Sequence, residues 1–232
     1  MCLDESTSWT TLIAGTIVNT AILIYFLKHL KKDPNVIIPL ISLLIWQYAL
    51  LMQIPDALSW RSLNKGIKPN INIGKTAAVL NFTQPIIVLI GVYLIILSLN
   101  KPTRALYPAM VACLVYVILV LTYVTSNKRN FDVDPGTKCR SLDYAWWNNT
   151  GYLNLLYIIV TILCILAIPQ VPGPNWRIVM MIIFLGSLFA MMAVNYKYQK
   201  QGKGDGCNTG SLWCWSIASA GLILFFIYYL TR

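Results

Sequence analysis

The stretch TAAVLNFTQPIIVLIGVYLIILSL, residues 76–99, decides the fold class of this chain. It contains no Asp, Glu, Lys, Arg or His. A helix needs about 20 apolar residues to cross the hydrocarbon core of a bilayer, because each residue adds roughly 1.5 Å. The stretch therefore predicts a helix that spans a membrane.

Six other stretches share this length and this lack of charge. They are residues 9–27, 36–54, 105–126, 144–168, 178–196 and 211–230. Backbone groups in lipid must be satisfied within a helix or a closed barrel, and these stretches are too long and too evenly apolar for barrel strands. We therefore expect an all-α fold, a seven-transmembrane helical bundle that forms a single polytopic membrane domain over residues 1–232.

The composition supports the same class. Of the 232 residues, 57% are hydrophobic and 11% are charged, with a mean hydropathy of +0.64. Soluble domains are typically about 25% charged, so the lipid bilayer is the expected partner of most of the surface. Asp4 and Glu5 stand where a signal peptide would carry basic residues, so the first stretch is expected to be retained as a helix. The predicted localisation is that of an integral, multi-pass membrane protein.

An odd number of spans places four cysteines at the same end of the bundle: Cys2, Cys139, Cys207 and Cys214. Four cysteines allow two disulfides in three connectivities, and disulfides are typical of a lumenal or extracellular face. We expect the loops after the fourth and sixth spans to meet over the mouth of the bundle. We therefore predict a Cys139–Cys207 disulfide worth about 2–4 kcal/mol, with Cys2 and Cys214 as the next pair. Buried free thiols are the alternative.

The basic residues point to the opposite orientation. The end with the cysteines carries eleven Lys and Arg residues, whereas the other end carries seven. The positive-inside rule would make the end with more basic residues cytoplasmic. Cysteines and charges therefore disagree, and the sequence leaves the orientation in the membrane open.

Motifs for catalysis and cofactor binding are missing from the sequence. It contains no glycine-rich phosphate loop, no nucleophile elbow, no paired carboxylates within a span and no cysteine spacing typical of a metal site. The last span has no lysine that could hold retinal, and His29 lies in a basic turn. We expect no enzyme activity, no metal, no cofactor and no nucleic-acid partner.

Polar side chains gather around the second and third spans. The candidate polar cavity consists of Gln47, Gln53, Asp56, Asn81, Gln84 and Pro85. Asn81 and Gln84 share a helix face, and Pro85 cannot donate a hydrogen bond to the Asn81 carbonyl, which predicts a kink and a free acceptor. These groups could line the path of a small solute. The simpler interpretation is that the amides join helices, at about 0.6–2 kcal/mol each, and that Asp56 lies at a helix end beside a loop lysine.

Part of this region resembles a known group of proteins. The matching residues are Gln47-Tyr48, 53–56 (QIPD), Gly74-Lys75 and 81–85 (NFTQP). They are similar to an uncharacterised family of multi-span membrane proteins encoded by large DNA viruses of eukaryotes. Where that family has an acidic residue in the second span and a histidine in the third, this chain has neutral residues, so a shared role in ion handling is not expected.

The resemblance implies a viral origin. The internal membrane of a virion, or a host endomembrane, is then the expected location. Such viruses often encode thiol oxidases, which would allow disulfides on a face derived from the cytoplasm. That would reconcile the cysteines with the basic charge.

Three functions are compatible with these features. The first is a structural or interaction role, in which basic, disulfide-braced loops contact partner proteins. The second is a transporter or channel for a small solute, using the third span. The third is a seven-helix receptor, which only the number of spans supports, since the sequence has neither an Asp-Arg-Tyr triplet nor an Asn-Pro-x-x-Tyr motif. We favour the structural role.

Overall fold

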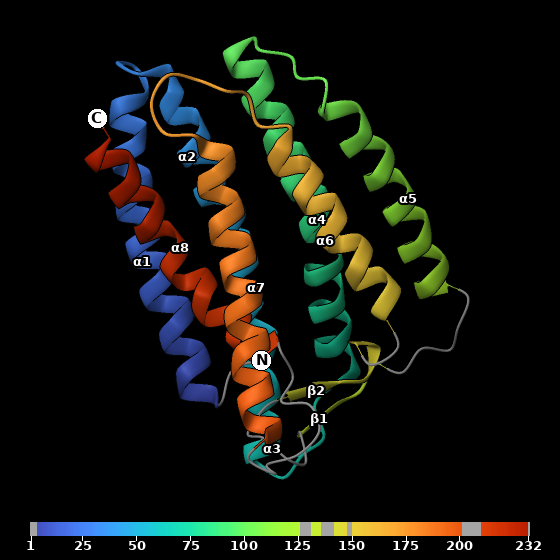
Figure 1. Cartoon of the computed structure of the whole chain (residues 1–232). Helices are drawn as coiled ribbons and strands as arrows, with labels where there is room; N and C mark the ends of the chain where they lie inside the picture. The colour runs from blue at the N-terminus through green and yellow to red at the C-terminus, as the bar shows by residue number, and fades with distance from the viewer. Residues whose placement is uncertain (1–3, 126–130, 136–141, 148–149, 201–209, 232) are drawn as a thin grey trace.

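The computed structural model describes residues 4–125, 131–135, 142–147, 150–200 and 210–231; for 143, 147, 190–191, 194–200 and 210–219 it describes the backbone alone. Long helices make up nearly all of this part of the chain (Figure 1). They are α1 (Glu5–Leu30), α2 (Ile37–Leu50), α3 (Gln53–Asn64), α4 (Ile71–Leu99), α5 (Leu106–Thr125), α6 (Gly151–Leu166), α7 (Trp176–Lys200) and α8 (Gly210–Leu230). The predicted all-α class is therefore confirmed.

Each of the seven predicted stretches coincides with a helix, but two boundaries were wrong. The second stretch, predicted to end at residue 54, contains α2 and continues as α3 to Asn64. The fifth, predicted from residue 144, becomes helical only at Gly151, where α6 begins. Residues 142–147 form instead a short strand β2 (Leu142–Tyr144) and a 3₁₀ turn (Ala145–Trp147).

The chain breaks its helix between α2 and α3, just before Pro55. Leu51 N–H bonds to the Tyr48 carbonyl and Met52 N–H to the Ala49 carbonyl, at 3.1 and 3.2 Å, which closes a tight turn. In a continuous helix the Pro55 ring would clash with the Leu51 carbonyl and leave it without a donor. In the first turn of α3 the missing Pro55 N–H costs nothing, because that N–H would have no helical partner.

Pro85 does not interrupt its helix. α4 runs without a gap from Ile71 to Leu99, with Pro85 inside it, and the kink expected at Pro85 stays a prediction. The Asn70 side chain accepts a hydrogen bond from Asn72 N–H at 2.9 Å at its start. Asn100 ends it in a left-handed conformation, with φ 49°. The proline that interrupts a helix is therefore Pro55 and not Pro85.

The helices run alternately between two ends of the bundle, called here the lower and the upper end as drawn in Figure 1. At the lower end α1 begins beside the end of α3, where the Asn64 amide lies 3.5 Å from Glu5 Oε2. At the upper end α8 closes on the connection between α1 and α2, where the Tyr228 hydroxyl lies 3.4 Å from Asp33 Oδ2. The first and last described helices thus begin and end at opposite ends, as the odd number of spans predicts.

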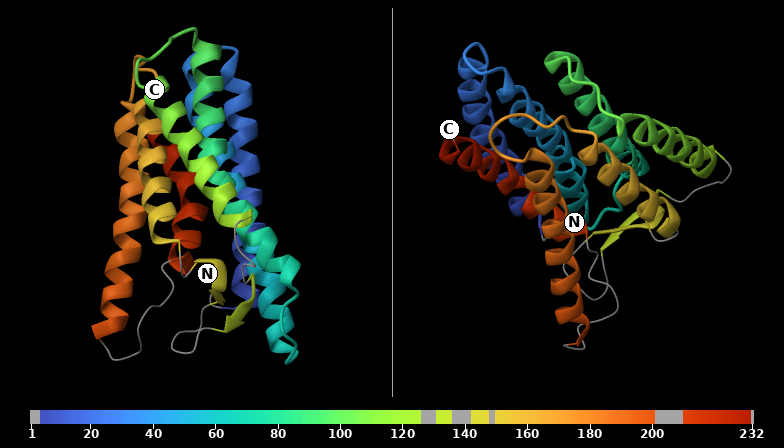
Figure 2. Two further views of the ribbon diagram at one scale, coloured as in Figure 1. Left: turned by 90° about the vertical axis from the view of Figure 1, so that its right-hand side faces the viewer. Right: turned by 45° about the horizontal axis from the view of Figure 1, so that its top comes forward.

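α2 lies at the centre of the packing. It contacts α1, α4 and α8, while α6 lies between α5 and α7 and also contacts α4. α5 lies on the outer flank, beside α4 and α6 (Figure 2). A small antiparallel hairpin at the lower end pairs β1 (Val133–Pro135) with β2, in a register that sets Val133 opposite Tyr144. Strands of three residues are too short for an alternating pattern to reveal them in the sequence.

The described surface is apolar along the length of the helices. α5, for example, exposes Leu114, Ile118 and Leu121 by 61%, 53% and 57%. Among the described residues, four helical segments are long and apolar enough to cross a membrane, by length and composition: Glu5–Leu30, Pro34–Asn64, Ile71–Leu99 and Leu106–Thr125. α6 is shorter, with 16 residues, and is likewise apolar.

Candidate functional site

Four of the six residues of the predicted polar cavity make contacts in three different places. These are a contact of α1, α2 and α8 around Gln47; a buried cluster at the lower end with Gln53 and Asp56; and a contact of α4 with α6 at Gln84. Each group makes contacts of its own. The structure thus shows three separate polar contacts between elements, and one cavity common to all six residues stays a prediction.

Gln47 joins α2 to α1. The Asn19 amide donates to Gln47 Oε1 at 2.9 Å, and the Gln47 amide donates to Thr16 Oγ1 at 3.0 Å. Asn19 is 3% exposed, and its own Oδ1 has no hydrogen-bond partner among the described residues. That oxygen lies directly against Gly221 of α8, where any β-carbon would collide with it. α1 and α8 thus come close together at Asn19 and Gly221.

Gln53, Asp56 and Ser59 form one buried face of α3. All three are fully buried. Their spacing of three residues places them on the same side of a helix. The Tyr144 hydroxyl donates to Asp56 Oδ1 at 2.8 Å, linking α3 to β2 across 88 residues of sequence. Asp56 therefore lies in the first turn of α3, at the kind of helix end where it was expected, and it is buried there. Its pairing with a loop lysine stays a prediction. A carboxylate in a first turn is favoured by the helix dipole.

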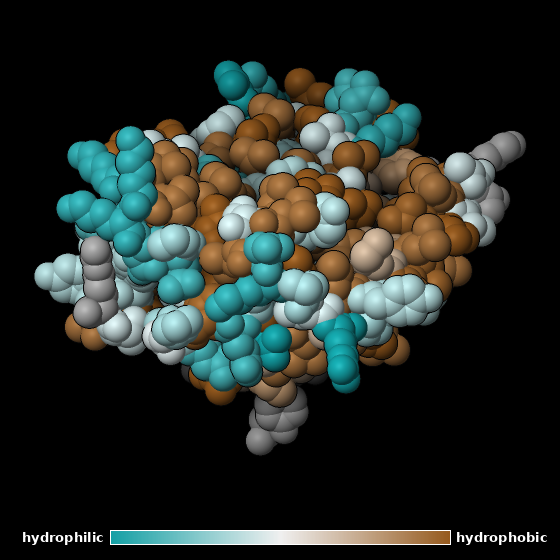
Figure 3. Space-filling model, turned by 90° about the horizontal axis from the view of Figure 1, so that it is seen from above, coloured by the Kyte–Doolittle hydropathy of each residue, from teal (hydrophilic) through white to brown (hydrophobic). Residues whose placement is uncertain are grey.

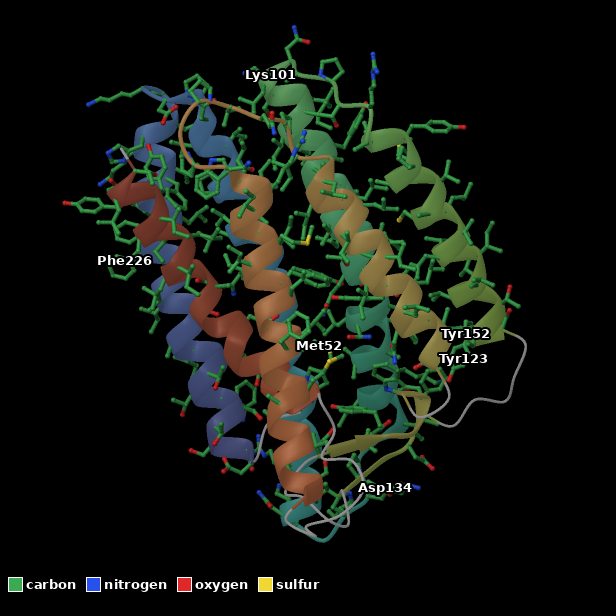
Figure 4. The ribbon with its side chains drawn as sticks, in the orientation of Figure 1. Met52, Lys101, Tyr123, Asp134, Tyr152 and Phe226 are labelled. Atoms are coloured by element: carbon green, nitrogen blue, oxygen red, sulfur yellow. The ribbon has the colours of Figure 1, made fainter. Side chains whose placement is uncertain are left out.

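Aromatic side chains cover this buried cluster. The Tyr144 and Trp146 rings lie 5.7 Å apart between centroids, and Trp146 packs edge-on against Phe82 of α4 at 5.2 Å. The Tyr123 hydroxyl, labelled in Figure 4 near the lower end, donates to the Trp146 carbonyl at 2.9 Å. Met52, also labelled there, is buried at the α2–α3 break. The hairpin thus closes the lower end of the bundle with an apolar cover.

Gln84 makes the contact between α4 and α6. Its Oε1 accepts a hydrogen bond from the Tyr157 hydroxyl at 2.7 Å, and it is 6% exposed. It lines a cavity of about 40 Å³ that is otherwise walled by Thr161 and by apolar and aromatic side chains of α2, α4, α6 and α7. Sites for small molecules usually measure roughly 300–1,000 Å³, whereas a single water needs about 10–15 Å³. The cavity is large enough for water but not for an organic solute.

Asn81 and Pro85 add nothing to this cavity. Neither is among the residues that line it. Asn81 is half-buried, and its side chain makes no hydrogen bond to the described residues. Tyr48, by contrast, was not predicted, yet it lines the cavity and its hydroxyl bonds to Thr83 on α4. The other residues that line the cavity with Gln84 come from α2, α6 and α7, and from α4 itself through Val88.

We predict that the Gln84–Tyr157 contact is an ordinary interhelical bond. Tyr157→Phe should lower the free energy of unfolding by about 0.6–2 kcal/mol, because it removes one hydrogen bond between helices and leaves the ring in place. Unfolding in mixed SDS micelles, followed by circular dichroism, measures this. Tyr152→Phe is the matched control, because Tyr152 is on the same helix and 53% exposed. Equal losses in the two variants would contradict the assigned contact.

The cysteine predictions fall outside what the structure describes. Cys2, Cys139 and Cys207 lie in the undescribed segments, and the side chain of Cys214 is likewise not described. Cys113 of α5 and Cys164 of α6 are buried free thiols. Within the described part of the chain no group of three or more His, Cys, Asp or Glu side chains could hold a metal ion. The Cys139–Cys207 disulfide stays a prediction.

Sequence reasoning missed Asn19, Tyr144 and Tyr157. Asn19 could have been found, since it is the only amide within residues 9–27. The two tyrosines could not, because Tyr is common at both ends and inside membrane-type helices, and nothing in the sequence says which polar group faces which.

No family model, no curated protein and no solved structure matches this chain. The function is therefore inferred from the contacts between the helices and from the charges at the two ends of the bundle.

Proposed function

We propose that this protein is a multi-pass integral membrane protein with a structural role, and that its functional contacts are made by the connections at the ends of the bundle. The observation that carries the proposal is the inverted polarity of the bundle. Polar side chains such as Asn19 and Gln84 are buried, while isoleucines and leucines are exposed along the helices. Such a surface is stable in lipid, where polar groups must find partners inside the protein.

The distribution of charge supports the same placement. α5 and α6 contain no Asp, Glu, Lys, Arg or His, and α4 has no charged residue between Lys75 and its end. Every described Lys and Arg side chain therefore lies at or near an end of the bundle. A charge at the centre of a bilayer costs roughly 2.5–3.5 kcal/mol even on the lowest scales.

The bundle interior gives little support to a transport path. The half-buried Gln47 and the buried Gln84 bond to neighbouring helices, and the Gln84 cavity measures about 40 Å³. A solute crossing the bilayer would need polar groups free to replace its water. The transporter remains the alternative hypothesis, favoured only by the polar lining that Gln84 gives this cavity.

At the lower end the α3–α4 connection offers a surface for a protein partner. It exposes Lys65, Lys68 and Ile67, the last by 61%, and Arg61 and Lys75 are exposed beside it. Lys68 donates to Asp132 at 2.8 Å, and this hydrogen bond raises the pKa of Lys68 above its ordinary value. Lys68 is thus engaged within the chain, and the other three cations are the ones that can meet an acidic partner.

We predict that a photo-activated crosslinker placed at Ile67 forms a discrete adduct with another protein in the native membrane. The same probe at Ile182 of α7, which is 65% exposed in the apolar surface, should form adducts with lipid alone. Reversing Arg61, Lys65 and Lys75 to Glu should abolish the Ile67 adduct. Adduct formation that persists after this reversal would contradict a contact based on these charges.

Flux measurements separate the structural role from the alternative. Vesicles with the purified protein should take up small polar solutes no faster than vesicles without it. Uptake that depends on the protein and is lost in the Gln84→Leu variant would overturn the structural role in favour of transport.

The resemblance to viral membrane proteins extends the proposal to a location. We propose the internal membrane of a virion, or the host endomembrane from which it derives, as the site of this structural role. In that setting a coat or capsid protein is the expected partner. Purified particles should contain the protein in a fixed ratio to the coat protein, and its absence from particles would remove this location.

A further inference from the structure

The upper end contains an open pocket with a strongly basic lining. It measures about 750 Å³ and lies between the α4–α5 and α6–α7 connections. Its lining includes three cations, Lys101, Arg104 and Arg177, and no carboxylate. We call these three residues and the hollow between them the basic pocket. Figure 3, which views this end directly, shows hydrophilic groups set among apolar residues, and Figure 4 labels Lys101 there.

No acidic group of the described chain neutralises the basic pocket. The acidic side chain at the upper end is Asp33, in the connection between α1 and α2. Asp33 accepts a hydrogen bond from Asn35 N–H at 3.0 Å and lies 3.4 Å from the Tyr228 hydroxyl of α8. It does not line the basic pocket. The positive potential of the three cations is therefore uncompensated.

Two hydrogen bonds hold the walls of the pocket in place. Thr103 Oγ1 donates to the Ala167 carbonyl at 2.8 Å, and Arg177 Nε donates to the Ile168 carbonyl at 2.6 Å. Both acceptors lie at the C-terminal end of α6. The partial negative charge of that helix end is therefore already paired with the Thr103 and Arg177 donors. The terminal nitrogens of Arg177 make no hydrogen bond to the described residues. They remain available for a planar, bidentate contact with an oxyanion.

Helix ends add to the same field. α5 begins at Leu106, directly after the pocket residues Thr103, Arg104 and Ala105, and α7 begins at Trp176, one residue before Arg177. Each helix N-terminus carries roughly half a positive charge. The pocket thus lies beside two helix starts and is lined by three cationic side chains, which is a setting for a phosphate group.

We propose that the basic pocket binds the phosphate of an anionic phospholipid headgroup. This inference rests on the proposed membrane insertion, because the pocket borders the charge-free segments of α4, α5 and α6 and would then lie at the depth of the headgroups. Leu166, which is 42% exposed, lines the pocket on the side of α6. It offers an apolar contact for the start of an acyl chain, which a soluble phosphate or an acidic peptide would not use.

Native mass spectrometry of the detergent-purified protein tests this site. With phosphatidylglycerol and phosphatidylcholine in equal amounts, the protein should retain phosphatidylglycerol preferentially. Lys101→Gln and Arg104→Gln should each weaken that binding about fivefold, the effect of one cation near an anionic membrane surface. Both side chains are exposed, so neither change should disturb folding. Arg177→Lys keeps the charge but loses the fork geometry, and should also weaken binding.

The control variant is the double substitution Lys31→Gln/Lys32→Gln. These two exposed lysines lie at the same end but outside the pocket. Removing them should change phosphatidylglycerol retention by less than twofold. Equal weakening by control and pocket variants, or no preference for phosphatidylglycerol, would overturn the proposed site. The site would instead be one for a free phosphate if millimolar glycerol phosphate displaced the lipid and if a Leu166→Ser variant retained phosphatidylglycerol as well as the wild type does.

Failure of this proposal can be told apart from failure of the proposed function. The membranes from which the protein is purified are first washed with alkaline carbonate, which releases proteins that are not inserted in the bilayer. A wild-type protein that stays in the membrane pellet but shows no lipid preference contradicts the basic pocket alone. A protein released by carbonate contradicts membrane insertion itself.

Discussion

Gly221→Ala should lower the free energy of unfolding by about 2–3 kcal/mol, although alanine is the better helix former. A β-carbon at Gly221 would lie 2.9 Å from Leu43 Cδ1 and would collide with Asn19 Oδ1. Overpacking of this kind typically costs about 1–3 kcal/mol. Asn19 can move aside only by breaking its hydrogen bond to Gln47, which costs about 0.6–2 kcal/mol of stability. SDS-induced unfolding followed by circular dichroism measures the difference.

A second variant tests the assigned cause. If the clash with Asn19 dominates, then Asn19→Ala/Gly221→Ala should be no less stable than Asn19→Ala alone, because the smaller side chain removes the collision. Gly186→Ala is the matched control on α7, since a β-carbon there meets nothing within 4 Å. Additive losses in the double variant would show that α1 and α8 do not meet at these two residues.

Asp56→Leu should cost about 2–3 kcal/mol of stability. The change leaves the fully buried Tyr144 hydroxyl without the acceptor that now lies 2.8 Å away. Removing one partner of a buried hydrogen bond costs roughly 1–3 kcal/mol. Asp56→Asn keeps an acceptor oxygen of the same shape and should lose less than half as much.

Two further variants test this prediction, one at the other partner of the hydrogen bond and one at an exposed control position. Tyr144→Phe removes the same hydrogen bond from the other partner and should cost about 1.5–3 kcal/mol. Asp134→Asn, at an exposed carboxylate of the same hairpin labelled in Figure 4, should stay within about 0.5 kcal/mol of the wild type. A Tyr144→Phe protein as stable as the Asp134→Asn protein would contradict the link between α3 and the hairpin.

The helices could be predicted from the sequence because the property that forms them is local. A charge-free apolar run such as 76–99 has one stable arrangement in lipid, whatever its neighbours are. The predicted boundary of the second stretch was wrong because of a single residue. Pro55 follows the apolar residues of α2 closely and prevents the helix from continuing, although the sequence stays apolar.

The polar contacts could not be predicted in the same way, because they depend on how the helices are arranged. Gln84 meets Tyr157, which is 73 residues away in the sequence, and Asp56 meets Tyr144 across 88 residues. The sequence shows that the second and third spans each contain two amides. It could not say that Gln47 faces α1 whereas Gln84 faces α6, since both helices are apolar around most of their circumference.

Membrane insertion with the two ends of the bundle on opposite sides is the central claim of this account. The most direct measurement adds an epitope tag before Met1 and another after Arg232, and digests sealed vesicles of one orientation with protease from outside. The account predicts that one tag is destroyed and the other is protected until detergent opens the vesicles. Two tags that are equally accessible, or equally protected, would contradict it.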